Sequence, residues 1–109
     1  MPHFDATTEE EVNKLIAENE GVAIIDFHAS WCGPCKIIGP KAVALSDSTG
    51  ILLIKIDVDQ AEELAAKMAV SSMPTFFAVK DTVSNVLKTM VGANAGNLEK
   101  LYQTAVENK

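Results

Sequence analysis

The chain has 109 residues, of which 48% are hydrophobic and 22% charged. This balance suits one globular domain over residues 1–109 and is too apolar for a disordered chain. Fifteen acids against nine bases give a net charge of −6, and all nine bases are lysines. A chain with no arginine and no basic surplus is not expected to bind nucleic acid or a membrane surface.

The longest apolar stretches, 22–25 and 51–54, are far too short to cross a bilayer. The first five residues lack the basic and apolar segments of a signal peptide. The chain has only two cysteines, which excludes a secreted scaffold held by several disulfides. These features together predict a cytoplasmic protein.

The first predicted element is a helix that begins near Thr8. Thr8 and Glu11 have the spacing of a capping box, and three consecutive glutamates place negative charge at the positive end of the helix dipole. Gly21 provides a stop for this helix. The nearly continuous apolar run at 22–27 then predicts a strand that is covered on both faces, as in a mainly parallel sheet.

A second helix is expected from Pro34, because proline is well suited to the first turn of a helix. It should bend at Pro40, whose ring does not fit an unstrained helix interior. The run 51–58 predicts another buried strand. A short helix follows, and we expect Asp59 and Glu62 to cap its N-terminus.

The last third of the chain predicts a hairpin and a helix. Strands at 75–80 and 86–91 should pair antiparallel, through a loose loop or bulge at 81–85 that lacks a glycine turn. One face of the last helix is apolar: Leu98, Leu101, Tyr102, Ala105 and Val106. The expected fold is α/β, with a central mixed sheet flanked by about four helices.

The two cysteines lie where the first buried strand meets the second helix. Cys32 is placed at the N-terminal end of that helix, where free N–H groups and the dipole stabilise a thiolate. Cys35 is three residues further on and returns to the same helix face, close enough to form a disulfide. Gly33 and Pro34 keep this ring short, so the arrangement suits a dithiol that cycles between two redox states.

The alternative for such a pair is a structural or metal site. Tetrahedral zinc needs four ligands, usually from two cysteine pairs or one pair with two histidines. The only histidines here, His3 and His28, have unsuitable spacing. No metal site is therefore expected.

The run from Asp26 to Lys36, DFHASWCGPCK, resembles the active-site signature of the thioredoxin family. The similarity extends over the whole chain and implies the thioredoxin fold. Further landmarks occur in the family's order: Pro40, Lys55, Ser72-Met73-Pro74-Thr75 and Val91-Gly92-Ala93.

The resemblance implies roles for both cysteines. Cys32 would be the nucleophile that attacks a disulfide in a target protein and forms a mixed disulfide. Cys35 would then attack Cys32, release the reduced target and leave the Cys32–Cys35 disulfide. Because the second thiol should be more buried, it needs a base to remove its proton.

Asp26 is the candidate base. A carboxyl group inside the apolar run 22–27 is desolvated, which raises its pKa toward neutrality. The plainer interpretation is an acid that caps a turn or faces solvent. Lys55 interrupts the next strand, where its ammonium group could tune Asp26 or could merely extend to the surface.

The resemblance also implies a shallow groove for protein substrates. Pro74 matches the family's cis proline opposite the cysteines, a position that would turn the Met73 backbone outward to pair with an extended segment. The expected groove residues are Trp31, Gly33, Pro34, Met73, Pro74, Gly92 and Ala93. Singly, each could be only a turn or packing residue.

His28 lies two residues after Asp26 and should share its face of the strand. The position is variable in the family. A partly buried, hydrogen-bonded histidine is the plainer interpretation. The sharper hypothesis is that His28 alters the pH dependence of the dithiol.

By resemblance, the chain is expected to be a protein-disulfide reductase and electron donor. A thioredoxin reductase that uses NADPH would recharge it, and peroxiredoxins or ribonucleotide reductase would be typical acceptors. It should hold no cofactor, since it has no glycine-rich dinucleotide loop. A monomer is expected, and the lack of a third cysteine excludes covalent dimers formed outside the active site. The alternatives are a disulfide oxidase or isomerase of the same fold and a non-catalytic docking subunit.

Overall fold

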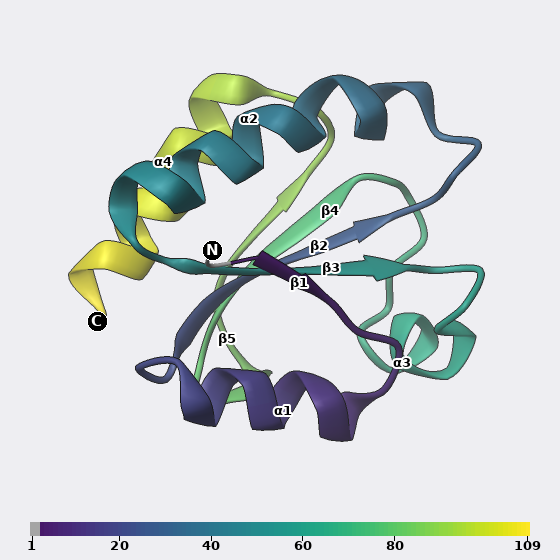
Figure 1. Cartoon of the computed structure of the whole chain (residues 1–109). Helices are drawn as coiled ribbons and strands as arrows, with labels where there is room; N and C mark the ends of the chain where they lie inside the picture. The colour runs from purple at the N-terminus through teal and green to yellow at the C-terminus, as the bar shows by residue number, and fades with distance from the viewer. Residues whose placement is uncertain (1–2) are drawn as a thin grey trace.

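The fold is a sheet covered by helices on both faces, as seen in a computed structural model that describes residues 3–109 (Figure 1). The sheet has five strands in the order β1-β3-β2-β4-β5. Helices α2 and α4 cover one face, and α1 and α3 cover the other (Figure 1). The elements are β1 His3–Asp5, α1 Glu9–Glu18, β2 Val22–His28, α2 Gly33–Thr49, β3 Leu52–Asp57, α3 Glu62–Lys67, β4 Thr75–Lys80, β5 Thr82–Val91 and α4 Ala95–Glu107.

The sheet is mixed, as predicted. β3 lies between β1 and β2 and is parallel to both, whereas β4 is antiparallel to β2 and to β5. Strand β1 was not predicted, because three residues of mixed polarity carry no periodic signal. This omission matters for the site, since β1 brings Asp5 into register with Lys55.

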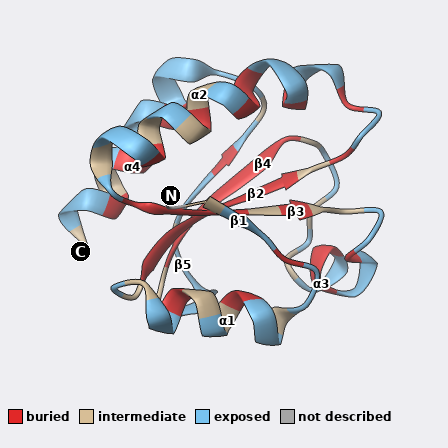
Figure 2. Cartoon of the chain, in the orientation of Figure 1, coloured by how far each residue is buried: buried red, intermediate tan, exposed pale blue. Residues whose placement is uncertain are grey.

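Each strand of the sheet centre sends alternate side chains to opposite faces. On β2, Ala23, Ile25 and Phe27 belong to the apolar cluster beneath α1 and α3. Val22 and Ile24 belong to the cluster beneath α2 and α4. The two clusters enclose the central strands, which are buried along most of their length (Figure 2).

The start of α1 is as predicted. Thr8 is the N-cap residue, and its side chain and that of Glu11 form a capping box. The helix ends at Glu18, capped by Asn19, so Gly21 lies in the turn beyond it, where its φ of +80° suits a residue without a side chain.

Two expectations for the other helices need correction. Asp59 and Glu62 do not cap α3: its N-cap residue is Ala61, with no side-chain capping bond. Helix α4 buries four of its five expected residues, but Val106 is 43% exposed. Helix α2 runs through Pro40 to Thr49.

The β4–β5 hairpin is tighter than expected. A loop was predicted over 81–85, but β5 already begins at Thr82, and Asp81 adopts a positive φ of 70°. The predicted irregularity is present as register shifts between Ala78 and Val79 and between Val79 and Lys80. Within the described part of the chain, no helix is long and apolar enough to cross a membrane.

Candidate active site

Cys32 is the N-cap residue of α2, as predicted. Its Sγ accepts a hydrogen bond from the backbone N–H of Cys35 at 3.1 Å. β2 ends four residues earlier, so the chain passes from the sheet to the helix through a short connection. A sulfur at this position receives the free N–H groups and the positive end of the helix dipole, both of which favour a thiolate.

Cys32 and Cys35 form a disulfide, with their Cα atoms 5.3 Å apart. Both residues are buried, and they pack with Ala29, Val58 and Met73. Cys32 is 4% exposed and Cys35 6%, so the expectation that Cys35 is the more buried of the two is wrong. The first turn of α2 therefore holds both sulfurs in reach of each other, as a dithiol that closes and reopens requires.

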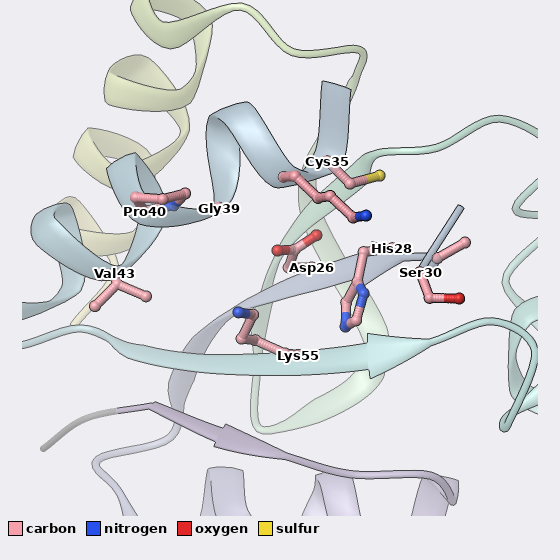
Figure 3. A pocket seen from close by; sticks show the side chains of 10 residues that line it. Asp26, His28, Ser30, Cys35, Gly39, Pro40, Val43 and Lys55 are labelled. Atoms are coloured by element: carbon pink, nitrogen blue, oxygen red, sulfur yellow. The ribbon is translucent and has the colours of Figure 1, made fainter. Parts of the chain in front are cut away.

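A cavity of about 350 Å³ lies behind Cys35, between the sheet and α2 (Figure 3). Asp26 and His28 from β2 and Lys55 from β3 enter it from the sheet side. The other lining residues are Ala29, Ser30, Lys36, Gly39, Pro40 and Val43. One space thus joins Cys35 to four ionisable side chains, those of Asp26, His28, Lys36 and Lys55.

Asp26 is 2% exposed, and its Oδ1 is buried without a hydrogen-bond partner. Burial raises the pKa of this carboxyl group to about 7, although the charge of Lys55 acts in the opposite direction. An acid with this pKa changes between its acid and base forms near neutral pH. The predicted burial and raised pKa of Asp26 are confirmed.

Lys55 lies directly beside Asp26, because the two residues are register partners on parallel strands. Its side chain lines the same cavity, and its positive charge acts to lower the pKa values of Asp26 and His28. Of the two interpretations of Lys55, the structure favours the one in which its charge tunes Asp26.

His28 shares the face of Asp26, as predicted, and is half-buried. Its Nε2 is buried without a partner, so the expectation of a hydrogen bond is wrong for this atom. Burial and the charge of Lys55 lower the pKa of His28, while Asp57 and Asp5 act to raise it. The ring is therefore predominantly neutral near pH 7.

On the outer side of the cysteines, the three neighbouring residues of the motif are exposed. Trp31 is 65% exposed, and Gly33 and Pro34 lie beside it at the start of α2. The indole Nε1 of Trp31 donates to Asp59 Oδ2 at 3.0 Å, which ties the ring to the connection after β3. Sequence reasoning assigned Asp59 to a helix cap and missed this role, for which the motif carries no signal.

The segments around Pro74 and Gly92 come together near the cysteines. The Met73–Pro74 peptide bond is cis, as the resemblance implies, and Met73 packs against the cysteine pair. The backbone N–H of Gly92 donates to the Pro74 carbonyl at 2.9 Å, and its φ of +98° favours glycine. Ala93 is exposed, directly after this bond.

Two exposed apolar residues were not predicted as part of this surface. Ile37 is 79% exposed on the first turns of α2, and Val91 is 63% exposed at the end of β5. The signal for Ile37 was available, since helical spacing points Ile38 and Ala42 into the core and leaves Ile37 facing away.

Among residues 3–109, no group of three or more His, Cys, Asp or Glu side chains is arranged to hold a metal ion.

Comparison with known proteins agrees with this geometry. The family model described as Thioredoxin matches residues 3–105. Thioredoxin 1 of Plasmodium falciparum is 40% identical over 98 residues, covering 89% of this chain and 91% of that protein. Thioredoxin-T of Drosophila melanogaster is 41% identical over 92 residues, 83% of this chain, and the match spans only 57% of that longer protein.

The fold is shared with solved structures of the same kind. The reduced Schistosoma mansoni thioredoxin pre-protein superposes with a TM-score of 0.86 at 31% identity, covering 96% of this chain and 99% of that one. The predicted thioredoxin fold is confirmed, and the match extends well beyond the cysteine motif. The chain belongs to the thioredoxin family.

Proposed function

We propose that this chain is a protein-disulfide reductase that acts as a single domain through Cys32 and Cys35. One observation carries the proposal: Cys32 caps α2 and is joined to Cys35 directly in front of the cavity that contains Asp26. In this proposal Cys32 is the nucleophile, Cys35 is the resolving thiol and Asp26, whose pKa is about 7, is the base.

In the first step, the Cys32 thiolate attacks one sulfur of a disulfide in a target protein. A new S–S bond joins Cys32 to the target, and the other target sulfur leaves as a thiolate that takes a proton from solvent. The N-terminal end of α2 stabilises the attacking thiolate before the reaction.

In the second step, Cys35 resolves the mixed disulfide. The Asp26 carboxylate accepts the Cys35 proton, and the resulting thiolate attacks Cys32 Sγ. The second target sulfur leaves, so the target gains two electrons and the cysteine pair is oxidised. Lys55 keeps a part of the Asp26 population ionised, since its charge opposes the effect of burial.

The substrate surface in this proposal is the set Trp31, Gly33, Pro34, Met73, Pro74, Gly92 and Ala93. It is supported by the exposure of Trp31, by the contact of Met73 with the cysteines and by the bond that joins Gly92 to Pro74. Exposed apolar atoms around a buried disulfide offer an extended polypeptide contact area beside the nucleophile.

The reductant and the location belong to the same proposal. The family implies targets with disulfides, and a thioredoxin reductase supplied by NADPH would return the pair to its dithiol form. Peroxiredoxins and ribonucleotide reductase are candidate acceptors. The expected location is the cytoplasm, since a reductant that is recharged by NADPH needs a reducing compartment. The expected form is a monomer.

Trapping tests the order of the two steps. Cys35→Ser should accumulate a mixed disulfide with a target such as insulin, because the resolving thiol is gone. Cys32→Ser is the matched control, since the chain has only two cysteines and this variant retains only the resolving Cys35. Equal trapping by both variants would contradict the assigned roles.

Equilibration of the pair against a glutathione redox buffer, followed by Trp31 fluorescence, separates reductase from oxidase or isomerase. A disulfide that persists until the buffer is strongly reducing supports the reductase. Reduction under mild conditions would reassign the chain to the oxidases or isomerases of the family.

A further inference from the structure

We propose that His28 is a proton-relay residue that carries protons between the Asp26 carboxyl group and solvent. The inference rests on the proposed reductase function and adds to it a residue that acts through Asp26 rather than on the sulfurs.

The relay is supported first by geometry. Asp26 and His28 are two positions apart on β2, so both point to the α2 side of the sheet and line the same cavity (Figure 3). Buried side-chain N and O atoms without a partner are rare among residues 3–109: they are Asp26 Oδ1, His28 Nε2 and His3 Nε2. Two of these three atoms belong to residues that line this one cavity; neither has a partner in the protein, so the relay needs a water between them.

The second support is a gradient of exposure. Asp26 is 2% exposed and has no solvent contact of its own, whereas His28 is half-buried. The cavity continues past His28 to Ser30 and Lys36, both of which are exposed. One route from Asp26 along the cavity to bulk water therefore passes the imidazole ring; a second exposed lining residue, Pro40, lies on the other side of Asp26 (Figure 3).

The charges around His28 keep its ring able to accept a proton. Lys55 on β3 and burial both favour the neutral imidazole, and Lys36 on α2 lines the same cavity. Asp57 on β3, which is the register partner of His28, and Asp5 on β1 favour the protonated ring. Because these charges act in opposite directions on the pKa of His28, both protonation states of the ring are accessible during turnover.

The relay moves protons only, and no group is oxidised or reduced. The protonated Asp26 carboxyl group gives its proton through a bridging water to Nε2, and the ring releases a proton from Nδ1 to solvent. Asp26 is then a carboxylate again and can accept the Cys35 proton. The relay matters because the pKa of Asp26 is about 7, so about half of the molecules at neutral pH hold a proton that must leave first.

Rapid mixing of the reduced protein with an aromatic disulfide, 5,5′-dithiobis(2-nitrobenzoate), tests this role. Attack by Cys32 releases the first coloured thiolate, and resolution by Cys35 releases the second. In His28→Ala we expect the first release to be unchanged and the second to become about tenfold slower at low buffer concentration near neutral pH.

Chemical rescue separates a relay from a packing role. Imidazole is small enough for a cavity of about 350 Å³ and should restore the second release in His28→Ala, while a bulky buffer of similar pKa should not. His28→Gln is the second variant, because it keeps a polar side chain of similar size but cannot carry a proton, and it should also be slow. His3→Ala is the matched control: it removes the other histidine, whose Nε2 is also buried and unpartnered but lies outside the cavity.

The outcomes are distinct. A slow second release that imidazole rescues supports the relay. A second release equal to that of the unmodified chain in both His28 variants, or slow release that imidazole does not rescue, overturns it. If the unmodified chain itself gives no second release, the proposed reductase function fails instead.

Discussion

The two faces of the sheet are made by the same strands but differ where the cysteines lie. Beneath α1 and α3, β2 presents Ala23, Ile25 and Phe27, and all three are fully buried in an apolar cluster. Beneath α2 and α4, the same strand begins apolar with Ile24 but then presents Asp26 and His28 to a cavity. The change from apolar to polar occurs within two residues of one strand.

This difference separates the part of the protein that stabilises it from the part that reacts. A buried carboxyl group without a partner costs free energy, because burial disfavours its charged form. The apolar face of the same strands offsets that cost by removing large side chains from water. The following predictions test whether the two faces divide stability and chemistry in this way.

The largest expected effect is on the apolar face. Phe27 is fully buried, and its ring meets that of Phe77 edge to face at a centroid distance of 5.7 Å. Phe27→Ala should lower the free energy of unfolding by about 4 kcal/mol, from lost burial and a new cavity. Urea denaturation measures this. The folded fraction should still reduce disulfides at the ordinary rate.

A loss of less than about 1 kcal/mol in Phe27→Ala would show that the apolar face does not carry the stability assigned to it. Reduction that slows in the folded fraction would show that the two faces are not separable.

The second prediction concerns Asp26 and pH. Its folded pKa of about 7 lies above the ordinary value of 3.8, so the unfolded chain ionises first as pH rises. The contribution of Asp26 to stability is therefore present below about pH 4 and is lost progressively up to about pH 7. Asp26→Asn lacks this step and should become the more stable form above pH 7, by at most about 4 kcal/mol.

Urea denaturation of the unmodified chain and of Asp26→Asn across that pH range measures the difference between their free energies of unfolding. The other titrating groups are the same in both proteins, so their contributions cancel in this difference. Two curves that stay parallel from acid to neutral pH would contradict the raised pKa. The same variant should resolve mixed disulfides more slowly, since Asn cannot accept the Cys35 proton.

Much of the site could be predicted from the sequence because its signals are local. A strand whose residues are nearly all apolar is covered on both faces of the sheet, which is why Asp26, inside such a run, was expected to be buried. Cys32 was expected at a helix N-terminus because Pro34 follows it closely. In the same way, the spacing of Thr8 and Glu11 was enough to predict the start of α1.

The missed features depend on contacts between distant segments. The hydrogen bond from Trp31 to Asp59 joins residues 28 positions apart, and no local sequence pattern predicts it. Strand β1 has three residues of mixed polarity and is held by pairing with β3. Val106 has the helical spacing of the buried residues of α4 but lies at the edge of that face. Whether such an edge residue is buried depends on the tertiary packing and not on the spacing.

The smallest expected effect comes from the missed strand. Asp5 on β1 and Asp26 on β2 are both register partners of Lys55, so the lysine stands between an exposed and a buried carboxyl group in one row across the sheet. Asp5→Asn removes the competing charge and leaves Lys55 more available to Asp26. The pKa of Asp26 should then fall below about 7 by less than one unit, as expected for a partly screened neighbour.

Carbon NMR titration of the Asp26 carboxyl group measures this shift. Asp81→Asn is the matched control, because it makes the same charge change on the far hairpin, at a positive φ of 70° that asparagine tolerates. A pKa that falls equally in both variants would reflect net charge alone. A fall in Asp5→Asn only would show that the polar row, unlike the apolar face opposite, is tuned from the edge of the sheet through Lys55.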